Sequence, residues 1–402
     1  MTERERRDAL RAGRPEVNLA GEPALGSMIG DEEVEAALRT IRASMNPEVG
    51  FRTAGSEAEP FEEELAAFFG TRFSVTLNSA GAGLDLAMRA LDLKPGDEVI
   101  CPSINFKAAP MAIVGQGGQW VPCEVDPRTL QADPSDVERR ITPRTRAILP
   151  VHMNGLSAPM DELLDVAERH PHPVHGPLKV IGDAARACGG GYKDTLIGKK
   201  GWMTIFSFHT QKNMTTLGEG GAVTTDDPMA ADRVFKLRFF GGNDGWGSSC
   251  LMTNVQAAVG RVQLRRLPKL IEARRRIAAE RTRLLSCSPG LTLPYEPTDC
   301  RHSYYLYTIL VPPAWAGEGR DTLCAMLRDD YRVNTVIANP PVHSTVPFLK
   351  QHVGDVQLPI SEELGARLFC PPIHPGMSEH DNRYICAAIL DAEERLRARL
   401  GP

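Results

Sequence analysis

Hydrophobic and polar positions form two kinds of pattern along the first two thirds of the chain. Short apolar runs, typical of buried strands, alternate with longer segments in which apolar residues recur at helical spacing. The sequence predicts strands over 72–79, 97–103, 119–127, 146–152, 178–185, 202–208 and 221–227. It predicts helices over 30–44, 57–70, 81–93, 134–141 and 159–170. This alternation predicts an α/β fold, a mostly parallel sheet between helices.

The pattern changes toward both ends of the chain. Residues 1–26 are polar and interrupted by Pro and Gly, which predicts an arm or a disordered lead-in. Residues 253–285 form a long, Arg-rich amphipathic pattern, and beyond it a short strand (304–312) mixes with helices (320–331 and 378–400). We therefore expect an N-terminal arm (1–26), a large α/β domain (27–265) and a smaller C-terminal α+β domain (266–402).

Composition narrows the class of protein. The 402 residues are 42% hydrophobic and 24% charged, with a net charge of -5, which gives no reason to expect nucleic acid as a partner. No apolar stretch approaches the ~18 residues of a membrane span, and the charged N-terminus is no signal peptide. None of the nine cysteines forms a C-x-x-C pair, and no metal site is predicted. We expect a cytoplasmic protein with reduced thiols.

Three polar features follow predicted strands, where α/β sheets bind ligands. The segment "NSAGAG" (78–83) is typical of an anion-binding helix start, and equally of a tight turn without a ligand. Asp183 ends an apolar strand; it either caps the next helix or faces a cation. Lys212 is either a solvated surface lysine or a desolvated nucleophile. Ser207 and His209 also have ordinary alternatives to a role in a site. Ser207 would be a cap at the end of the strand, and His209 would be a packed, hydrogen-bonded imidazole.

The order of these features indicates one cofactor. Pyridoxal 5'-phosphate (PLP) has a phosphate, a ring nitrogen that is better protonated, and an aldehyde that forms a Schiff base with lysine. An anion cradle, a strand-end Asp183 and then Lys212 supply a partner for each group. We therefore expect a PLP site.

The stretch "SFHTQKNMTTLGEGG" (207–221) resembles the S-F-H-x-x-K-x-x-T-x-G-E-G-G run of the DegT/DnrJ/StrS-type PLP-dependent aminotransferases, which have the aspartate-aminotransferase fold (fold type I). The segments "GDEVICPSINFKAAPMAI", "GDAARACGGGY" and "CPPIHPGMSEHD" also match at family-typical spacing. The resemblance runs from about residue 28 to the C-terminus. It implies a seven-stranded, mostly parallel sheet between helices, and a homodimer with active sites near the interface.

The resemblance also implies a role for each matched residue. Lys212 would form the Schiff base and move the proton, and Asp183 would pair with the pyridine nitrogen. The remaining cofactor-binding residues would be Ser207 and the backbone of Ala80 and Gly81 at the phosphate, Phe106 on the ring face, and His209 in support. For Phe106 the ordinary alternative is a core phenylalanine.

Three departures from the family pattern alter these expectations. The usual S-G-T of the cradle is Ser79-Ala80-Gly81, so the hydroxyl of the family's Thr, a contact to phosphate, is missing. The Gln that usually lies near the cofactor's phenolic oxygen is Arg186, which would stabilise a phenolate, bind an anionic substrate group, or point away. Where the family usually has N-Y-R-M, residues 249–252 of this chain are Ser-Cys-Leu-Met. The chain therefore lacks the Asn that, in relatives, reaches the phosphate bound by the neighbouring subunit. Asn243 and Asn254 are the candidates to replace it.

The resemblance implies transfer of an amino group from glutamate or glutamine to a keto-sugar, nucleotide-linked, or to a ketocyclitol. Retention of Lys212 favours this reaction. The alternatives are another PLP reaction on the same scaffold (decarboxylation, elimination or carbon–carbon bond formation) and a non-catalytic, PLP-binding regulatory relative. Acceptor specificity is expected in the loops 45–56, 241–250 and 338–345, where Arg52, His343 and Asn339 are candidates beside the simpler alternative of solvated loop residues.

Overall fold

The computed structural model describes residues 1–13, 20–50, 56–243 and 245–400. Its centre is a seven-stranded sheet in the order β1-β9-β8-β5-β4-β2-β3. The strands are β1 (Phe73–Leu77), β2 (Glu98–Pro102), β3 (Gln119–Cys123), β4 (Thr145–Ile148), β5 (Lys179–Asp183), β8 (Met203–Ser207) and β9 (Gly221–Thr225). Neighbours from β3 to β8 are parallel, whereas β9 runs antiparallel to both β8 and β1. The mostly parallel sheet predicted from the sequence is confirmed.

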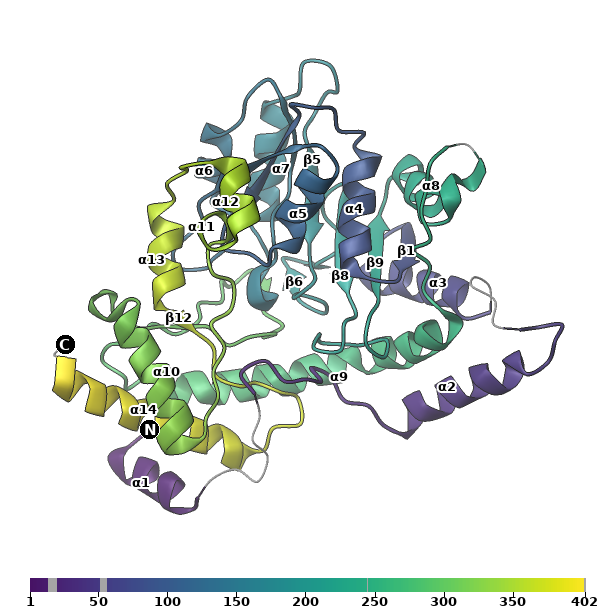
Figure 1. Ribbon diagram of the computed structural model, residues 1–402. Coiled ribbons are helices and arrows are strands. Elements are labelled where there is room, and N and C mark those ends of the chain that lie inside the picture. The colour runs from purple at the N-terminus through teal and green to yellow at the C-terminus, as the bar shows by residue number, and fades with distance from the viewer. Residues whose placement is uncertain (14–19, 51–55, 244, 401–402) are drawn as a thin grey trace.

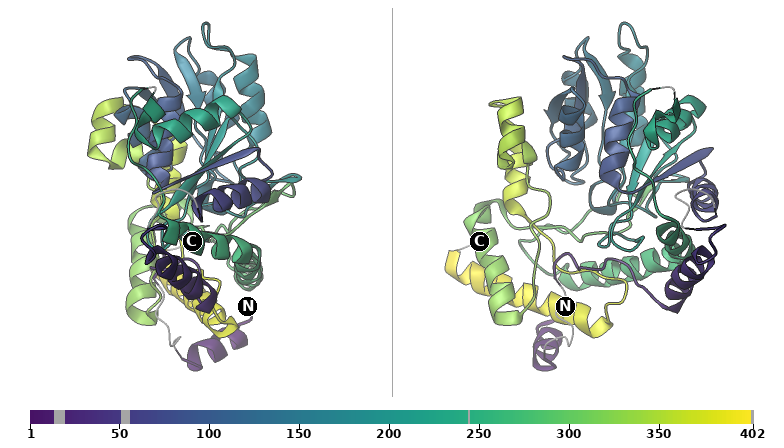
Figure 2. Two further views of the ribbon diagram at one scale, coloured as in Figure 1. Left: turned by 90° about the vertical axis from the view of Figure 1, so that its right-hand side faces the viewer. Right: turned by 45° about the vertical axis from the view of Figure 1, so that its right-hand side comes forward.

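Helices cover both faces of this sheet, as Figures 1 and 2 show. On one face, Ile181 and Ile205 belong to a hydrophobic cluster with α4 (Ala80–Ala90), α5 (Ala108–Gly115) and α8 (Pro228–Leu237). On the other face, Val180 packs with α6 (Pro134–Arg139) and α7 (Met160–Arg169). Phe206 packs there with α3 (Ala58–Phe69) and α9 (Asn254–Leu285). Successive strand residues thus face opposite layers, as the period of two requires.

Helix α9 leaves the sheet region and continues into a second hydrophobic cluster (Figure 1). That cluster packs α9 against α10 (Glu318–Tyr331) and α14 (Glu379–Leu400). The remaining short elements are β6 (Gly191–Tyr192), β7 (Thr195–Leu196), β10 (Cys300–Arg301), β11 (Ile309–Leu310), β12 (Leu368–Phe369), α11 (Val342–Thr345), α12 (Pro347–Val353) and α13 (Pro359–Arg367), with 3-10 turns η1 (Met153–Gly155), η2 (Phe240–Asn243) and η3 (Pro313–Trp315).

The strand predicted over 304–312 is largely wrong. Only β11 forms there, paired with β12. Tyr304 has φ +49°, which breaks the extended conformation, and the backbone N–H of Ser303 and Leu306 donate to the carbonyls of Gly155 and Asn154 rather than to a strand. The apolar side chains are buried, but the backbone between them forms a bend.

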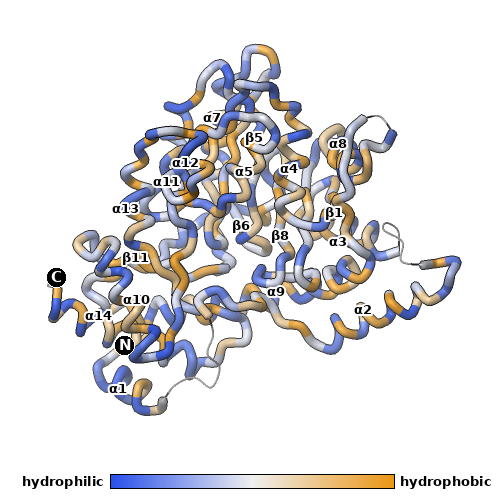
Figure 3. Tube along the Cα trace, in the orientation of Figure 1, coloured by the Kyte–Doolittle hydropathy of each residue, from blue (hydrophilic) through white to orange (hydrophobic). Residues whose placement is uncertain are grey.

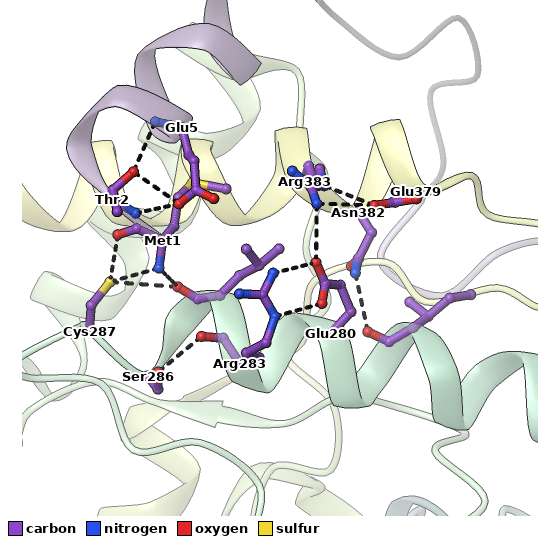
Figure 4. A network of polar contacts seen from close by, with 12 residues as sticks. Met1, Thr2, Glu5, Glu280, Arg283, Ser286, Cys287, Glu379, Asn382 and Arg383 are labelled. Carbon is purple, nitrogen blue, oxygen red and sulfur yellow. Dashed lines mark hydrogen bonds and ion pairs between the residues drawn. The ribbon is translucent and has the colours of Figure 1, made fainter.

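The lead-in is more ordered than its composition indicates. Residues Glu3–Arg11 form α1, which begins with a capping box between Thr2 and Glu5 and packs against α14. Figure 4 shows that the N-terminus also contacts the end of α9: the Met1 amine donates to the Leu284 carbonyl at 2.7 Å, and the Cys287 thiol lies beside it. Disorder, one of the two alternatives predicted for this segment, is therefore wrong for residues 1–13, whereas the N-terminal arm stays a prediction.

Helix α2 (Asp31–Ser44) packs along α9, with Ala36 against Ala258 and Val262, and projects from the body of the molecule in Figure 1. Figure 3 shows hydrophobic positions along α2 as well as in the sheet. Among the helices of the described residues, none is long and apolar enough to cross a bilayer.

Candidate active site

A cavity of about 730 Å³ lies at the carboxyl ends of β5 and β8, beside the start of α4. This is where open α/β sheets bind ligands. All eight residues predicted to bind the cofactor line it: Ala80, Gly81, Phe106, Asp183, Arg186, Ser207, His209 and Lys212. The structure brings them together, while the role of each residue stays a prediction.

The anion cradle is the first turn of α4. Ser79 is its N-cap and accepts the Ala82 N–H at 3.1 Å, so the N–H groups of Ala80 and Gly81 are left without an intrahelical acceptor. A Cβ on Gly221 would lie 2.7 Å from the Ala80 nitrogen, so only glycine lets β9 approach this turn. Asn78 also lines the cavity, and its buried Oδ1 has no hydrogen-bond partner.

Lys212 lies on the loop that joins β8 to β9. The loop is held like a hairpin, because Phe208 and Thr210 donate their N–H groups to the carbonyls of Gly220 and Gly218 at 2.8 and 2.9 Å. Its lysine donates from Nζ to the Tyr305 hydroxyl at 3.3 Å. At the start of the loop, the Ser207 hydroxyl accepts the His209 N–H at 3.3 Å. The His209 ring lies 3.8 Å from Glu219.

Burial shifts the ionisation of the central pair. Desolvation, followed by the charge of Arg186, lowers the pKa of Lys212 to about 8. Burial raises the pKa of Asp183, and the Ala185 N–H, which donates to its Oδ1 at 3.0 Å, partly offsets that shift. Lys212 is therefore a half-buried amine whose lowered pKa favours the neutral form more than that of a solvated surface lysine.

Arg186 points into the cavity rather than away from it. Its Cζ lies 5.4 Å from the centroid of the Tyr305 ring, and its Nη1 donates to Asn154 Oδ1 at 3.3 Å. The same Asn154 oxygen accepts from Asn339 at 2.9 Å. Asn154 has φ +55°, so a left-handed backbone conformation presents its amide to both donors.

Sequence reasoning missed Glu22 and Tyr305, which carry no recognisable motif. Glu22 lines the cavity from the N-terminal segment, and the Tyr305 hydroxyl donates to it. His152, in contrast, is not among the residues that line the cavity. It is buried with Nε2 unpaired beside Gly182, and burial lowers its pKa to about 3, so it is neutral.

The other candidates fall outside this cavity. His343 is buried between Ser103 and Glu362, at 2.6 and 3.0 Å, and Asn339 is buried beside Asn154, so neither is a solvated loop residue. Asn243 is exposed in η2. Asn254 starts α9 with its Oδ1 buried and unpaired. Arg52 lies outside the described residues.

The residues present fit PLP. The start of α4 and Ser207 suit a phosphate, Asp183 suits a protonated ring nitrogen, and Lys212 suits the aldehyde. The unpaired Oδ1 atoms of Asn78 and Asn105, both in the cavity lining, are polar groups that a bound polar ligand would satisfy. A cavity of this size accommodates a cofactor together with a small substrate.

Comparison with known proteins agrees with this geometry. Residues 31–390 match the model of the DegT/DnrJ/EryC1/StrS aminotransferase family. A Streptomyces venezuelae protein named dTDP-3-amino-3,4,6-trideoxy-alpha-D-glucose transaminase is 34% identical over 90% of this chain and 96% of its own length. The crystal structure of S. venezuelae DesV in complex with a ketimine intermediate superposes with a TM-score of 0.82, at 34% identity, over 90% of this chain and 96% of that one.

The PLP form of Spr1654 from Streptococcus pneumoniae, described as a putative sugar aminotransferase, gives a TM-score of 0.85 at 25% identity, over 93% of this chain and 99% of that one. These matches confirm fold type I and the expected cofactor. The chain belongs to the DegT/DnrJ/EryC1/StrS aminotransferase family and is a PLP-dependent aminotransferase.

Proposed function

We propose that this enzyme transfers an amino group from glutamate or glutamine to the keto group of a nucleotide-linked sugar or of a cyclitol. The juxtaposition of Lys212, Asp183 and the first turn of α4 in one cavity carries the proposal. The name of the S. venezuelae relative, an amino-sugar transaminase, supports the sugar class.

In this proposal, each residue of the chain has a defined task. When bound, PLP supplies an electron sink for the carbon that exchanges its amino group. Lys212 anchors the cofactor and then carries a proton on Nζ, which its low pKa permits near neutral pH. Asp183 keeps the ring nitrogen protonated. Ser207 and the N–H groups of Ala80 and Gly81 hold the phosphate, and Phe106 covers the ring.

Removal of the Lys212 amine tests the proposal. Lys212→Ala is expected to abolish borohydride-trapped cofactor on the loop peptide and to reduce turnover by at least about a thousandfold. Asp183→Asn, which keeps the shape and removes the charge, is expected to retain trapping but lose turnover. Persistent transamination by Lys212→Ala would contradict the proposal.

The donor is tested separately. Glutamate or glutamine added to the PLP-loaded enzyme is expected to convert the cofactor to its amine form, seen as loss of the visible absorbance band. Mass spectrometry then identifies which keto-sugar or ketocyclitol restores it. No spectral change with any amino donor would favour a different PLP reaction on this scaffold.

We also propose that the enzyme is a homodimer with its active sites near the interface. Val34, Ile41 and Met45 are 48%, 42% and 79% exposed and share one face of α2. Phe240 and Trp246 add further exposed apolar surface. Exposed apolar side chains that share one face of a helix are typical of an interface.

A further inference from the structure

The N-terminal segment over 20–28 packs closely against the β8–β9 loop, which carries Lys212. A Cβ on Gly26 would lie 1.8 Å from the Gln211 carbonyl oxygen, and a Cβ on Gly21 would lie 2.3 Å from the Val336 nitrogen. The Gly26 N–H donates to the Thr210 carbonyl at 2.9 Å, and the buried Arg274 donates to the Gly26 carbonyl at 2.5 Å. These contacts fix the backbone on both sides of Glu22.

Glu22 ends a short chain of polar contacts that begins at the active-site lysine. Lys212 Nζ donates to the Tyr305 hydroxyl at 3.3 Å, and that hydroxyl donates to the Glu22 carboxylate. Tyr305 is only 2% exposed, so its hydroxyl has little access to water. Its ring lies near two cations, with Lys212 Nζ at 4.7 Å and Arg186 Cζ at 5.4 Å from the centroid.

The charges around the cavity also favour a role for Glu22. Lys212 and Arg186 are two half-buried cationic groups, and Asp183 and Glu22 are the carboxylates that act on both of them, whereas Glu219, also in the cavity lining, acts on Lys212 alone. Asp183 is committed to the cofactor's ring nitrogen in the proposed function. Glu22 is then the carboxylate left to offset the cations on the side of Tyr305.

We infer that Glu22 is a positioning residue of this active site: through the Tyr305 hydroxyl it orients the Lys212 amine and supplies its counter-charge. The inference rests on the proposed function only in taking Lys212 as the cofactor's anchor. It makes the 20–28 segment a working part of the site rather than a lead-in, since the segment's glycine contacts set where Glu22 lies.

The test measures the lysine itself in the full-length protein, after bound PLP has been released with hydroxylamine and removed by dialysis. Lys212 is acetylated in competition with a reference amine across pH 6–11, and mass spectrometry of its peptide gives the pH midpoint of its reactivity. Glu22→Gln removes a negative charge near the ammonium, which disfavours the protonated form, so the midpoint is expected to fall by about 0.5 pH unit or more. Glu168→Gln, an exposed carboxylate on α7, is the matched control with no expected shift.

A double-mutant cycle tests whether Glu22 acts through Tyr305. In a Tyr305→Phe background, Glu22→Gln is expected to shift the midpoint by less than about half as much, because the connecting hydroxyl is gone. Glu22→Asp, which keeps the charge, is expected to restore a midpoint near that of the unchanged protein. Equal shifts in both backgrounds, or no shift in Glu22→Gln, would overturn the inference.

Two further readouts separate this inference from the proposed function. Circular dichroism and thermal unfolding establish that each variant folds. If Glu22→Gln does not fold, the Lys212 midpoints of Glu22→Asp and Tyr305→Phe are compared instead. Acetylation needs neither cofactor nor substrate, so an enzyme that failed to transaminate would still give a Lys212 midpoint. Conversely, a normal midpoint in Glu22→Gln would leave the aminotransferase proposal untouched.

Discussion

Lys212 shows how the site sets the reactivity of one amine. Burial and Arg186 favour the neutral form, whereas Glu22 and Asp183 favour the ammonium. The resulting pKa of about 8 makes the amine neutral often enough to attack an aldehyde, while it still accepts a proton afterwards. Arg186 replaces the uncharged residue that the family pattern has at its position, so this balance belongs to the present chain.

Cofactor capture should therefore depend on pH in a predictable direction. Because only the neutral amine attacks, the rate of PLP attachment is expected to rise about tenfold from pH 7 to pH 9 and then level off. Arg186→Gln removes a cation that disfavours the ammonium, so its midpoint should lie above that of the unchanged enzyme. Stopped-flow absorbance at a series of pH values measures both.

An exposed arginine on α9 supplies the matched control for this experiment. Arg276→Gln removes the same charge far from the cavity lining and should leave the midpoint unchanged. A midpoint in Arg186→Gln that is equal to or below that of the unchanged enzyme would contradict this account of the Lys212 pKa.

At the scale of elements, the active site depends on two segments that pass each other with no side chain between them. The 20–28 segment crosses the β8–β9 loop at Gly26, where backbone lies directly on backbone. The same loop carries Lys212, and the same segment carries Glu22. A change in their spacing therefore alters both the stability of the fold and the geometry of the amine.

Gly26→Ala should be severe. The added Cβ would lie 1.8 Å from the Gln211 carbonyl, so one backbone must move, and the free energy of unfolding is expected to fall by about 2–4 kcal/mol. The displaced loop should also weaken PLP binding. Urea denaturation and absorbance titration with PLP measure the two effects.

Gly115→Ala, at the end of α5, is the matched control. A Cβ there meets nothing within 4 Å, so this change should be neutral or stabilise the protein by up to about 1 kcal/mol. Equal stability of the two variants would show that the crossing at Gly26 is looser than described.

The sequence predicts the sheet and the central site residues correctly wherever a local sequence pattern determines them. Ile181 and Val180 already indicate opposite faces of a strand, and Lys212, Asp183 and Ser207 stand in recognisable motifs. Glu22 could not be found this way, because it reaches the lysine only through the Tyr305 hydroxyl, and both Tyr305 and Lys212 are distant from it in sequence. The capping-box residues Thr2 and Glu5 are present in the sequence, but the polar composition of residues 1–26 favours an arm or disorder over a helix.

Other differences arise where tertiary contacts override a local pattern. The apolar run over 304–312 has a strand's composition, yet Tyr304 adopts a left-handed conformation because neighbouring backbone bonds to the loop at 154–155. The burial of His343 likewise depends on Ser103 and on Glu362. A single sequence pattern carries no information on such pairings.

For the whole molecule, the remaining question is what covers the apolar face of α2. The helix buries Ala36 and Thr40 on the body of the protein and leaves a stripe at 34, 38, 41 and 45 facing away. Side chains at this spacing form one continuous ridge on a helix. In water such a ridge is unfavourable unless a partner covers it, and a second copy of the chain is the partner that the family resemblance implies.

Val34→Glu with Ile41→Glu is therefore expected to convert the proposed homodimer into a monomer, because two charges would be buried in the proposed interface. Sedimentation velocity should show the mass of one chain for this variant and of two for the unchanged enzyme. Val174→Glu is the matched control, since that side chain is 79% exposed on a different loop, and it should remain dimeric. PLP affinity should fall with dissociation if the active sites lie near the interface. An unchanged mass in the double variant would show that the exposed apolar face of α2 does not form the dimer interface.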